Sequence, residues 1–242
     1  MGSLAKSFLS NKSLLFSNLV RHVSSVATPN DRCAWFNFID RPNDETAFRT
    51  LWMKGGNYIK QVDGFVKTHL YKAVDNDARY QWVNFTEVDR EDFPFFSDTD
   101  VFWSNYIEEV MKLGYKGTPA GYKHVTSLKD NSLTDDSDGF FLSAVKVNSA
   151  QLTDDKFERN WENLTGTTFI HENLNPENLT NSHLYKQFKL LPIFNYTVRT
   201  EVINIDDKTG SDIAKAANER QLSQRMTATT GFYRLDTTLN RL

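Results

Sequence analysis

A pentapeptide occurs twice in this chain, with a long spacing between its copies. Residues 68–72 read Thr-His-Leu-Tyr-Lys, and residues 182–186 read Ser-His-Leu-Tyr-Lys, 114 positions later. The alignment continues without a gap to Val88 and Val202, where both segments end on Thr-Glu-Val. A repeat of roughly 100 residues is too long for a solenoid unit and suits a small domain. The chain therefore reads as two copies of one domain.

Both copies show the same order of expected elements, which is strand, helix, strand, strand, helix, strand. Alternating or aromatic runs between turn residues predict the strands, and helical spacing of apolar residues predicts the helices. In the first copy we expect strands at 34–39, 65–73, 80–88 and 122–127 and helices at 44–58 and 101–113. In the second copy we expect strands at 140–147, 182–189, 193–202 and 231–235, helices at 154–163 and 211–222, and an inserted loop at 166–181.

This order is that of the ferredoxin-like split βαβ arrangement, in which both helices cover one face of an antiparallel sheet. The expected strand 80–88 is apolar on both faces, with Tyr80, Trp82 and Val88 on one side and Val83 and Phe85 on the other. A sheet that is apolar on both faces needs a second layer, which the other copy can supply. We therefore expect an α+β fold of two tandem ferredoxin-like (βαββαβ) domains, at residues 31–128 and 140–242, joined by a polar, acidic linker at 129–139.

The first 30 residues differ in composition from the rest of the chain. They contain Lys6, Lys12, Arg21 and seven serines, and the first acidic residue is Asp31. Leu15, Leu19, Val23 and Val26 would form an apolar stripe on a helix. A basic, serine-rich, acid-free and amphipathic segment is typical of a mitochondrial transit peptide. The alternative is an ordinary amphipathic N-terminal arm.

The bulk composition excludes several classes of protein. A net charge of −3 does not indicate the positively charged surface that nucleic-acid binding needs. No apolar run reaches the roughly 18 residues that a transmembrane helix needs. A single cysteine, Cys33, excludes an intramolecular disulfide framework and a multi-cysteine zinc site. The five histidines lack the spacing of a metal site, so we expect no metal.

The first copy resembles the antibiotic-biosynthesis-monooxygenase-like family, whose members form dimeric α+β barrels. The resemblance rests on the Phe-Asn-Phe-Ile run at 36–39, on Gly64-Phe65 with residues 70–73, on 75–77, on the segment 80–85 with Glu87, and on Phe93. It covers residues 34–128, and it reaches 139–238 only through the internal repeat. It implies that the two copies pair as an intramolecular dimeric α+β barrel. The family includes small-quinone monooxygenases, haem-degrading enzymes and barrels without demonstrated activity.

The haem-degrading branch implies an Asn on the first strand, a Trp after the third strand and a His on the second helix. Asn37 could fill the first role, but Glu87 or Val88 stands where the Trp is expected. The second expected helix of each copy contains no His. Haem degradation is therefore disfavoured, and we expect no cofactor. Only the alternative hypothesis, that the protein is an enzyme, would involve a haem or a quinone.

The repeat places two His-Tyr pairs at equivalent positions, His69 with Tyr71 and His183 with Tyr185. Within a barrel such a pair could move a proton to or from a phenolic substrate, which makes these four residues the candidate catalytic groups. A structural origin is the simpler explanation, because hydrogen-bonded histidines inherited from a duplicated ancestor would show the same pattern.

Three further side chains are candidates for lining a ligand pocket, namely Asn37, Trp82 and Asn84. An enzyme would hold His69, Tyr71, Trp82 and Asn84 around one closed, aromatic-lined cavity. Aromatic residues at strand spacing more often belong simply to the core.

We expect a non-catalytic accessory or structural subunit of a mitochondrial multiprotein assembly, most specifically a respiratory-chain complex. It would reside in the matrix or at the inner membrane, contact other protein subunits, and meet the membrane only peripherally through the complex. The alternative is an enzyme, either a cofactor-independent monooxygenase or a haem- or quinone-binding barrel. A small-ligand sensor, which needs the cavity without the proton-transfer pair, is a third possibility.

Overall fold

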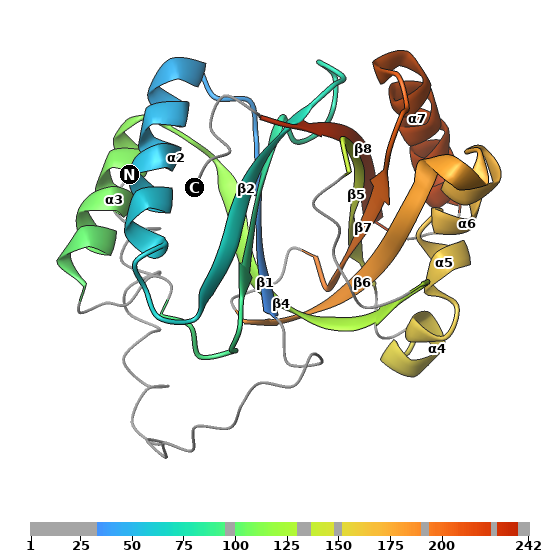
Figure 1. Cartoon of the computed structure of the whole chain (residues 1–242), viewed down its shortest axis with the longest axis horizontal. Helices are drawn as coiled ribbons and strands as arrows, with labels where there is room; N and C mark the ends of the chain where they lie inside the picture. The colour runs from blue at the N-terminus through green and yellow to red at the C-terminus, as the bar shows by residue number, and fades with distance from the viewer. Residues whose placement is uncertain are drawn as a thin grey trace.

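A computed structural model of the protein describes residues 33–94, 100–129, 137–147, 152–189, 194–223 and 227–236. Eight antiparallel strands form one closed barrel, in the order β1-β3-β2-β8-β5-β7-β6-β4 (Figure 1). The predicted N-terminal arm, 1–30, and residues 130–136 of the predicted linker lie outside the described residues.

The first half of the chain supplies one sheet of the barrel and two helices. Its elements are β1 (Cys33–Ile39), α2 (Glu45–Ile59), β2 (Phe65–Ala73), β3 (Trp82–Val88), α3 (Val101–Lys112) and β4 (Gly117–Ser127). Helix α2 begins where the Asp44 carboxylate accepts the N–H groups of Thr46 and Ala47, both at 2.9 Å. Such a cap satisfies backbone donors that have no partner within the helix.

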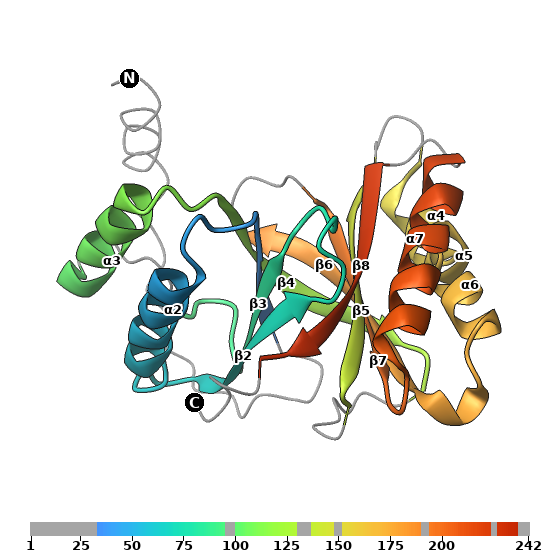
Figure 2. The same cartoon turned by 90° about the horizontal axis from the view of Figure 1, so that it is seen from above.

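The second half repeats this order with a more divided helical segment. Its elements are β5 (Gly139–Lys146), α4 (Asp154–Glu158), α5 (Trp161–Leu164), α6 (Thr167–Glu172), the 3-10 turn η2 (Pro176–Asn178), β6 (Leu179–Lys189), β7 (Tyr196–Val202), α7 (Asp207–Ser223) and β8 (Thr227–Leu235). Figure 2 shows α2 and α3 on one side of the barrel and the helices of the second half on the other.

The predicted fold class is confirmed, since the strand order within each half is that of a ferredoxin-like sheet and the two sheets close one barrel. The sheets meet at two seams, where β4 pairs with β6 and β2 pairs with β8. The inherited repeat is also visible in side-chain contacts. Thr68 and Thr86 share a hydrogen bond of 2.8 Å, and their counterparts Ser182 and Thr200 share one of the same length.

Side chains alternate between the two faces of each strand, which divides the core into the barrel interior and two outer layers. The interior cluster is largely aromatic and draws on both halves, with Phe36, Phe38 and Phe85 from one and Phe140 and Tyr233 from the other. Burying one such side chain contributes about 1.5–3 kcal/mol, so the interior is a main source of stability. Separate outer clusters pack each sheet against its own helices, and a further cluster joins Cys33, Trp35 and Val88 to Phe93.

Two predictions about the elements were wrong in detail. The predicted strand 80–88 begins at Trp82, and Tyr80 lies before the strand, where it packs inside the barrel against Phe38. Tyr80 therefore does not share a face with Trp82. The predicted helix 154–163 is broken into α4 and α5, because Asn160 departs from helical geometry, with φ of −134° and ψ of 22°.

The predicted loop 166–181 was also wrong, since it contains α6, η2 and the first residues of β6. Gly166 starts α6 in the left-handed region, with φ of 77°, where a residue without Cβ avoids strain. None of the helices in the described part of the chain is long and apolar enough to cross a membrane.

Candidate functional site

The interior of the barrel contains ionisable side chains as well as aromatic rings. His69 and Tyr71 point inward from β2, where both rings lie near Phe85. Arg199 points inward from β7, with its guanidinium over the Phe85 ring. Glu201 follows two residues later on the same face, because residues alternate across a strand. The interior therefore brings together polar groups from both halves.

Hydrogen bonds and an ion pair join these groups across the boundary between the halves. His69 Nδ1 and Tyr71 Oη lie 3.3 Å apart, and Arg199 Nη2 donates to Tyr71 Oη at 3.3 Å. Arg199 Nη1 donates to Glu201 Oε1, which lies 3.8 Å from His183 Nε2. We call these five residues, His69, Tyr71, His183, Arg199 and Glu201, the interior network.

Because the interior network is buried, the loss of any of its charged side chains should destabilise the fold. Arg199 is 1% exposed, and Glu201 and His183 are 0% exposed. A charge at such a depth is tolerated only when it is paired and hydrogen-bonded. His69, in contrast, is half-buried, so the network approaches solvent at its β2 end.

Arg199 occupies the position that Phe85 holds in the first copy of the repeat. Its guanidinium carbon lies 5.1 Å from the Phe85 ring centroid and 4.7 Å from that of Phe140. A cation between two aromatic faces gains from the negative potential of both rings, especially when water is excluded. The side chain thus fills the space between the sheets while its charge is balanced by Glu201.

The two halves balance equivalent carboxylates with different cations. Glu87 is the counterpart of Glu201, and it is 2% exposed. Lys67 Nζ lies 3.8 Å from Glu87 Oε2, whereas the second half has Asn181 at the position of Lys67. In the second half the cation comes instead from Arg199, two residues before Glu201 on the same strand.

The second His-Tyr pair lies beside a third histidine. The His124 ring from β4 is 5.7 Å from the His183 ring and 5.6 Å from the Tyr185 ring, measured between centroids. Tyr185 also packs edge-on against Phe36 at 5.3 Å. Nearby, burial raises the pKa of Tyr122 to about 12, so this phenol stays protonated at neutral pH. All four predicted catalytic candidates, His69, Tyr71, His183 and Tyr185, therefore face the same interior.

The three predicted pocket residues lie on the opposite face of the first sheet. Trp52 Nε1 of α2 donates to Asn84 Oδ1 at 2.8 Å, and Trp82 packs against the same helix in an outer cluster. Asn37 alternates with the inward-facing phenylalanines of β1, and its Oδ1 faces Gly117, where an added Cβ would come within 2.6 Å. The structure does not bring Asn37, Trp82 and Asn84 together with Tyr71, because alternation directs them toward the helices.

The histidine that the resemblance to haem-degrading barrels implies is missing from both halves. Helices α3 and α7 contain no His. His171 of α6 is hydrogen-bonded to Ser182 Oγ at 2.9 Å, outside the barrel, and burial followed by nearby Lys129 lowers its pKa to about 4. Within the described part of the chain, no group of three His, Cys, Asp or Glu residues could hold a metal ion.

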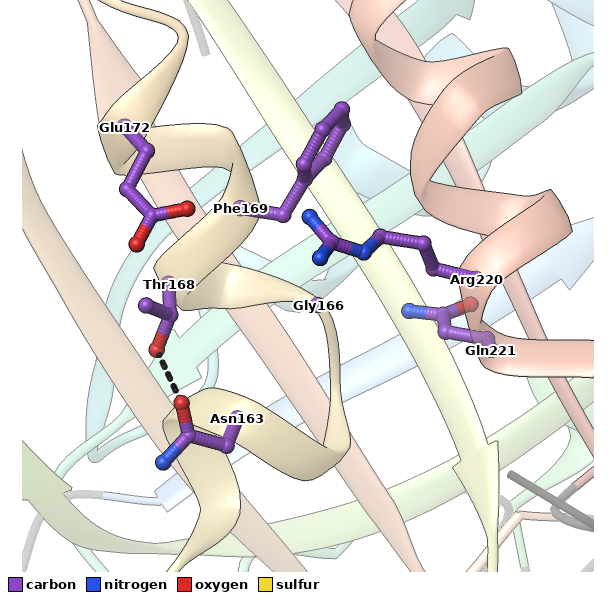
Figure 3. Close-up of a pocket in the computed structure, with 7 residues that line it drawn as sticks. All are labelled: Asn163, Gly166, Thr168, Phe169, Glu172, Arg220 and Gln221. Carbon is purple, nitrogen blue, oxygen red and sulfur yellow. Dashed lines mark hydrogen bonds between the residues drawn. The ribbon is translucent and has the colours of Figure 1, made fainter. Parts of the chain in front are cut away.

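A shallow surface pocket of about 180 Å³ lies between α6 and α7 (Figure 3). Its lining residues are Asn163, Gly166, Thr168, Phe169, Glu172, Arg220 and Gln221. Arg220 lies 4.8 Å from the centroid of the Phe169 ring, and Thr168 Oγ1 donates to Asn163 Oδ1 at 3.0 Å. Gln221 is hydrogen-bonded to Thr165 O and Thr230 Oγ1, which gives it a structural role. The pocket shows no arrangement of catalytic groups.

Sequence reasoning missed Arg199, Glu201 and His124. The repeat contained a signal for the first two, because Glu87 and Glu201 both lie in its Thr-Glu-Val ending and Arg199 replaces an aromatic residue two positions earlier. A charged residue that replaces a core aromatic marks a position where the copies have diverged in chemistry. His124 lies outside the aligned segment and carried no comparable signal.

A solved structure with a TM-score above 0.5 shares this architecture over most of the chain. An anthrone oxidase-like protein matches with a TM-score of 0.55 and 10% identity, over 85% of this chain and 91% of that one. A chlorite dismutase variant from Candidatus Nitrospira defluvii has a TM-score of 0.48 and 10% identity, over 85% and 92%. A cofactor-independent oxygenase from Streptomyces nogalater has a TM-score of 0.36 and 13% identity, over 41% and 99%. The first likeness confirms the predicted dimeric α+β barrel fold.

At sequence level, no curated protein matches the chain. A family model described as a domain of unknown function, DUF7153, matches residues 65–235, which span β2 to β8 and include the whole interior network. The match covers more than half of the chain, and the chain therefore belongs to the DUF7153 family.

Proposed function

We propose that this chain is a non-catalytic accessory subunit, docked through its surface to other proteins of a mitochondrial assembly, most specifically a respiratory-chain complex. One observation carries the proposal. The space between the two sheets is occupied by the protein's own side chains, with Arg199 held between Phe85 and Phe140 and paired with Glu201.

The energy needed to open this interior argues against a binding cavity there. A ligand entering between the sheets would have to displace Arg199 or the rings around it. Separating the guanidinium from Glu201 would leave a buried charge, at a cost of about 3–5 kcal/mol. A substrate would have to recover this energy before it gained any net affinity. The interior network therefore serves best as a contact that holds the two halves of the barrel together.

Helix α3 supports an interaction role, because it exposes apolar side chains. Val101 is 73% exposed and Met111 is 64% exposed, and Ile107 and Leu113 are also exposed. Trp103 is the buried residue of this helix, which lies beside α2 at the outer side of the molecule (Figure 2). Large apolar side chains that are exposed in the free chain are candidates for contact with another protein. We propose that another subunit covers them, and that any contact with the inner membrane is made through that complex.

The proposed mitochondrial location rests on the amino-acid composition of the N-terminal segment. The basic, serine-rich segment 1–30 is of the kind that directs proteins to mitochondria, and the respiratory-chain complex is proposed on that basis alone.

Native electrophoresis of fractionated cells, with mass spectrometry of the bands, tests this proposal directly. We expect the chain to migrate in a complex much larger than one chain and to be enriched in mitochondria. A Met111→Lys variant should weaken the assembly, whereas Lys208→Ala on α7, which alters a side chain 86% exposed, should not. Migration at the size of a single chain in every fraction would refute the proposal.

A second candidate function rests on the one part of the interior network that is near solvent. His69 is half-buried, and its Nδ1 lies 3.3 Å from Tyr71 Oη. A phenolic substrate at this end could transfer a proton to His69, with Tyr71 as the hydrogen-bonding partner. This would be a cofactor-independent monooxygenase, or a barrel that binds a quinone. Oxygen uptake with anthrone and hydroquinone substrates, abolished in His69→Ala, would favour this function over the accessory one.

A further inference from the structure

The surface pocket between α6 and α7 is built on the segment that distinguishes the second half from the first. Residues 165–178 join α5 to β6 and contain α6, whereas only residues 60–64 join α2 to β2. The α6 wall of the pocket therefore has no counterpart in the first copy of the repeat. Binding residues are often placed on such surface connections, which a rigid scaffold holds in position. The pocket is thus separate from the barrel interior in both place and origin.

Hydrogen bonds hold the walls of this pocket in place. Gln221 of α7 donates to Thr165 O, just before α6, and to Thr230 Oγ1 of β8 at 3.0 Å. Thr168 Oγ1 donates to Asn163 Oδ1 at 3.0 Å (Figure 3). A pocket that is ordered before binding loses less conformational entropy when a ligand enters. These polar side chains are engaged with one another, so recognition of a ligand would depend on the charged side chains beside them.

Two side chains of opposite charge line the pocket, Glu172 from α6 and Arg220 from α7 (Figure 3). The Arg220 guanidinium carbon lies 4.8 Å from the centroid of the Phe169 ring. A guanidinium beside an aromatic face keeps its planar fork of N–H groups available for a carboxylate. Within the described part of the chain, the Glu172 carboxylate makes no hydrogen bond or ion pair. The pocket therefore offers a fork of donors on one helix and a charged acceptor on the other.

The volume and the charges of the pocket limit what can occupy it. Its volume is about 180 Å³, and a cavity of about 150 Å³ is enough for a molecule the size of benzene. A phosphate or a dicarboxylate would suit Arg220 but would bring a like charge toward Glu172, which is unfavourable. A molecule that carries one carboxylate and one ammonium group within this size suits both side chains. Small α-amino acids have this chemistry.

We propose that this pocket binds a small α-amino acid, with its carboxylate on Arg220 and its ammonium group on Glu172. Both contacts are charge-assisted hydrogen bonds, which are the stronger kind. Because the ligand is small and the pocket is open to solvent, the dissociation constant should be on the order of 1 mM. The inference goes beyond the proposed function, since occupancy of this pocket requires neither docking through α3 nor chemistry inside the barrel.

Titration of the full chain with L-valine or L-serine, followed by NMR of the backbone amides, tests the proposal. We expect saturable shifts at Gly166, Phe169 and Gln221 and no shifts in α2. Two matched probes each lack one charge of L-valine, because isovalerate has no ammonium group and isobutylamine has no carboxylate. Each should bind roughly tenfold or more weakly than L-valine, since one hydrogen bond between charged groups is lost.

Variants assign each charge of the ligand to its partner. Glu172→Gln should weaken L-valine binding roughly tenfold without weakening isovalerate binding. Arg220→Gln should weaken L-valine binding by a similar factor without weakening isobutylamine binding. The matched control is Glu219→Gln, which removes a charge next to Arg220 on α7 but outside the pocket lining, and it should leave binding unchanged. Thermal unfolding of each variant checks that the fold is retained.

Four outcomes overturn the proposal. The first is the absence of saturable shifts with both amino acids. The second is equal binding of L-valine, isovalerate and isobutylamine, which would show that the charges are not recognised. The third is tighter binding of isovalerate than of L-valine, which would assign the pocket to simple anions. The fourth is an effect of Glu219→Gln as large as that of Glu172→Gln, which would indicate overall charge rather than the pocket. None of these outcomes bears on the accessory role.

Discussion

Replacing Arg199 with phenylalanine tests whether the interior network stabilises the packing of the two halves against each other. Phenylalanine is what the first half carries at this position, so the substitution keeps an aromatic-sized side chain and removes only the charge and its hydrogen bonds. Glu201, 0% exposed, then keeps its negative charge without the guanidinium. Breaking a buried pair in this way costs about 3–5 kcal/mol. With a urea m-value of about 3 kcal/mol/M, the unfolding midpoint should fall by roughly 1 to 2 M.

The first half also provides a matched rescue. There the equivalent carboxylate, Glu87, is 3.8 Å from Lys67, and the second half has Asn181 at the lysine position. Adding Asn181→Lys to Arg199→Phe should restore a cation next to Glu201 and recover most of the lost stability. A loss of about 1–2 kcal/mol should remain, because Asn181 Oδ1 accepts two backbone N–H groups in the native protein.

Urea unfolding monitored by circular dichroism measures both variants. Lys208→Ala, on the exposed face of α7, is the control and should leave the midpoint unchanged. A loss below about 1 kcal/mol for Arg199→Phe would show that the ion pair contributes little. If the double variant were no more stable than Arg199→Phe, the assignment of equivalent roles to the two carboxylates would be wrong.

Three further predictions concern the layers around the interior. Gly117→Ala should lose about 1–3 kcal/mol in thermal unfolding, because its Cβ would come within 2.6 Å of Asn37 Oδ1, and Asn37→Ala in the same chain should restore part of it. Asp44→Ala should lose about 1 kcal/mol in urea unfolding through the missing cap of α2. Hydrogen bonding to Lys215 lowers the pKa of Asp75, so this contact stabilises the protein above the ordinary Asp pKa of about 3.9 and is lost as pH falls through the lower folded pKa. The difference in Tm between the native protein and Asp75→Asn should therefore shrink at acidic pH, and a difference that persisted there would contradict the assignment.

The repeat allowed the architecture to be predicted, because a copied strand must pair and pack in the same way twice. Sequence could not show which residues of neighbouring strands share a face, since that depends on register. Trp82 and Tyr71 were therefore placed around one cavity, although β3 begins at Trp82 and directs it toward α2. The same uncertainty hid Arg199, which contacts Tyr71, 128 positions earlier in the chain, and Glu201, which pairs with Arg199.

Helix boundaries were harder to predict in the second half than in the first. Asp44 gave α2 a recognisable start, whereas α4 and α5 have no side-chain cap and are separated by Asn160. The break between them is set by how Phe157 and Trp161 both reach the outer core, which is a tertiary constraint. Local propensity carries no information about it.

Fusion of the two copies into one chain permits a symmetry-breaking contact that two identical chains could not make. Arg199 lies over Phe85, its own counterpart in the repeat. In a symmetric pair of identical subunits, this contact would have to be Arg against Arg, which is repulsive, or Phe against Phe, which provides no charge for the carboxylates. Once the copies are covalently joined, each can mutate alone, and one aromatic face can receive one cation. The asymmetric centre of this barrel is thus a property of the tandem arrangement.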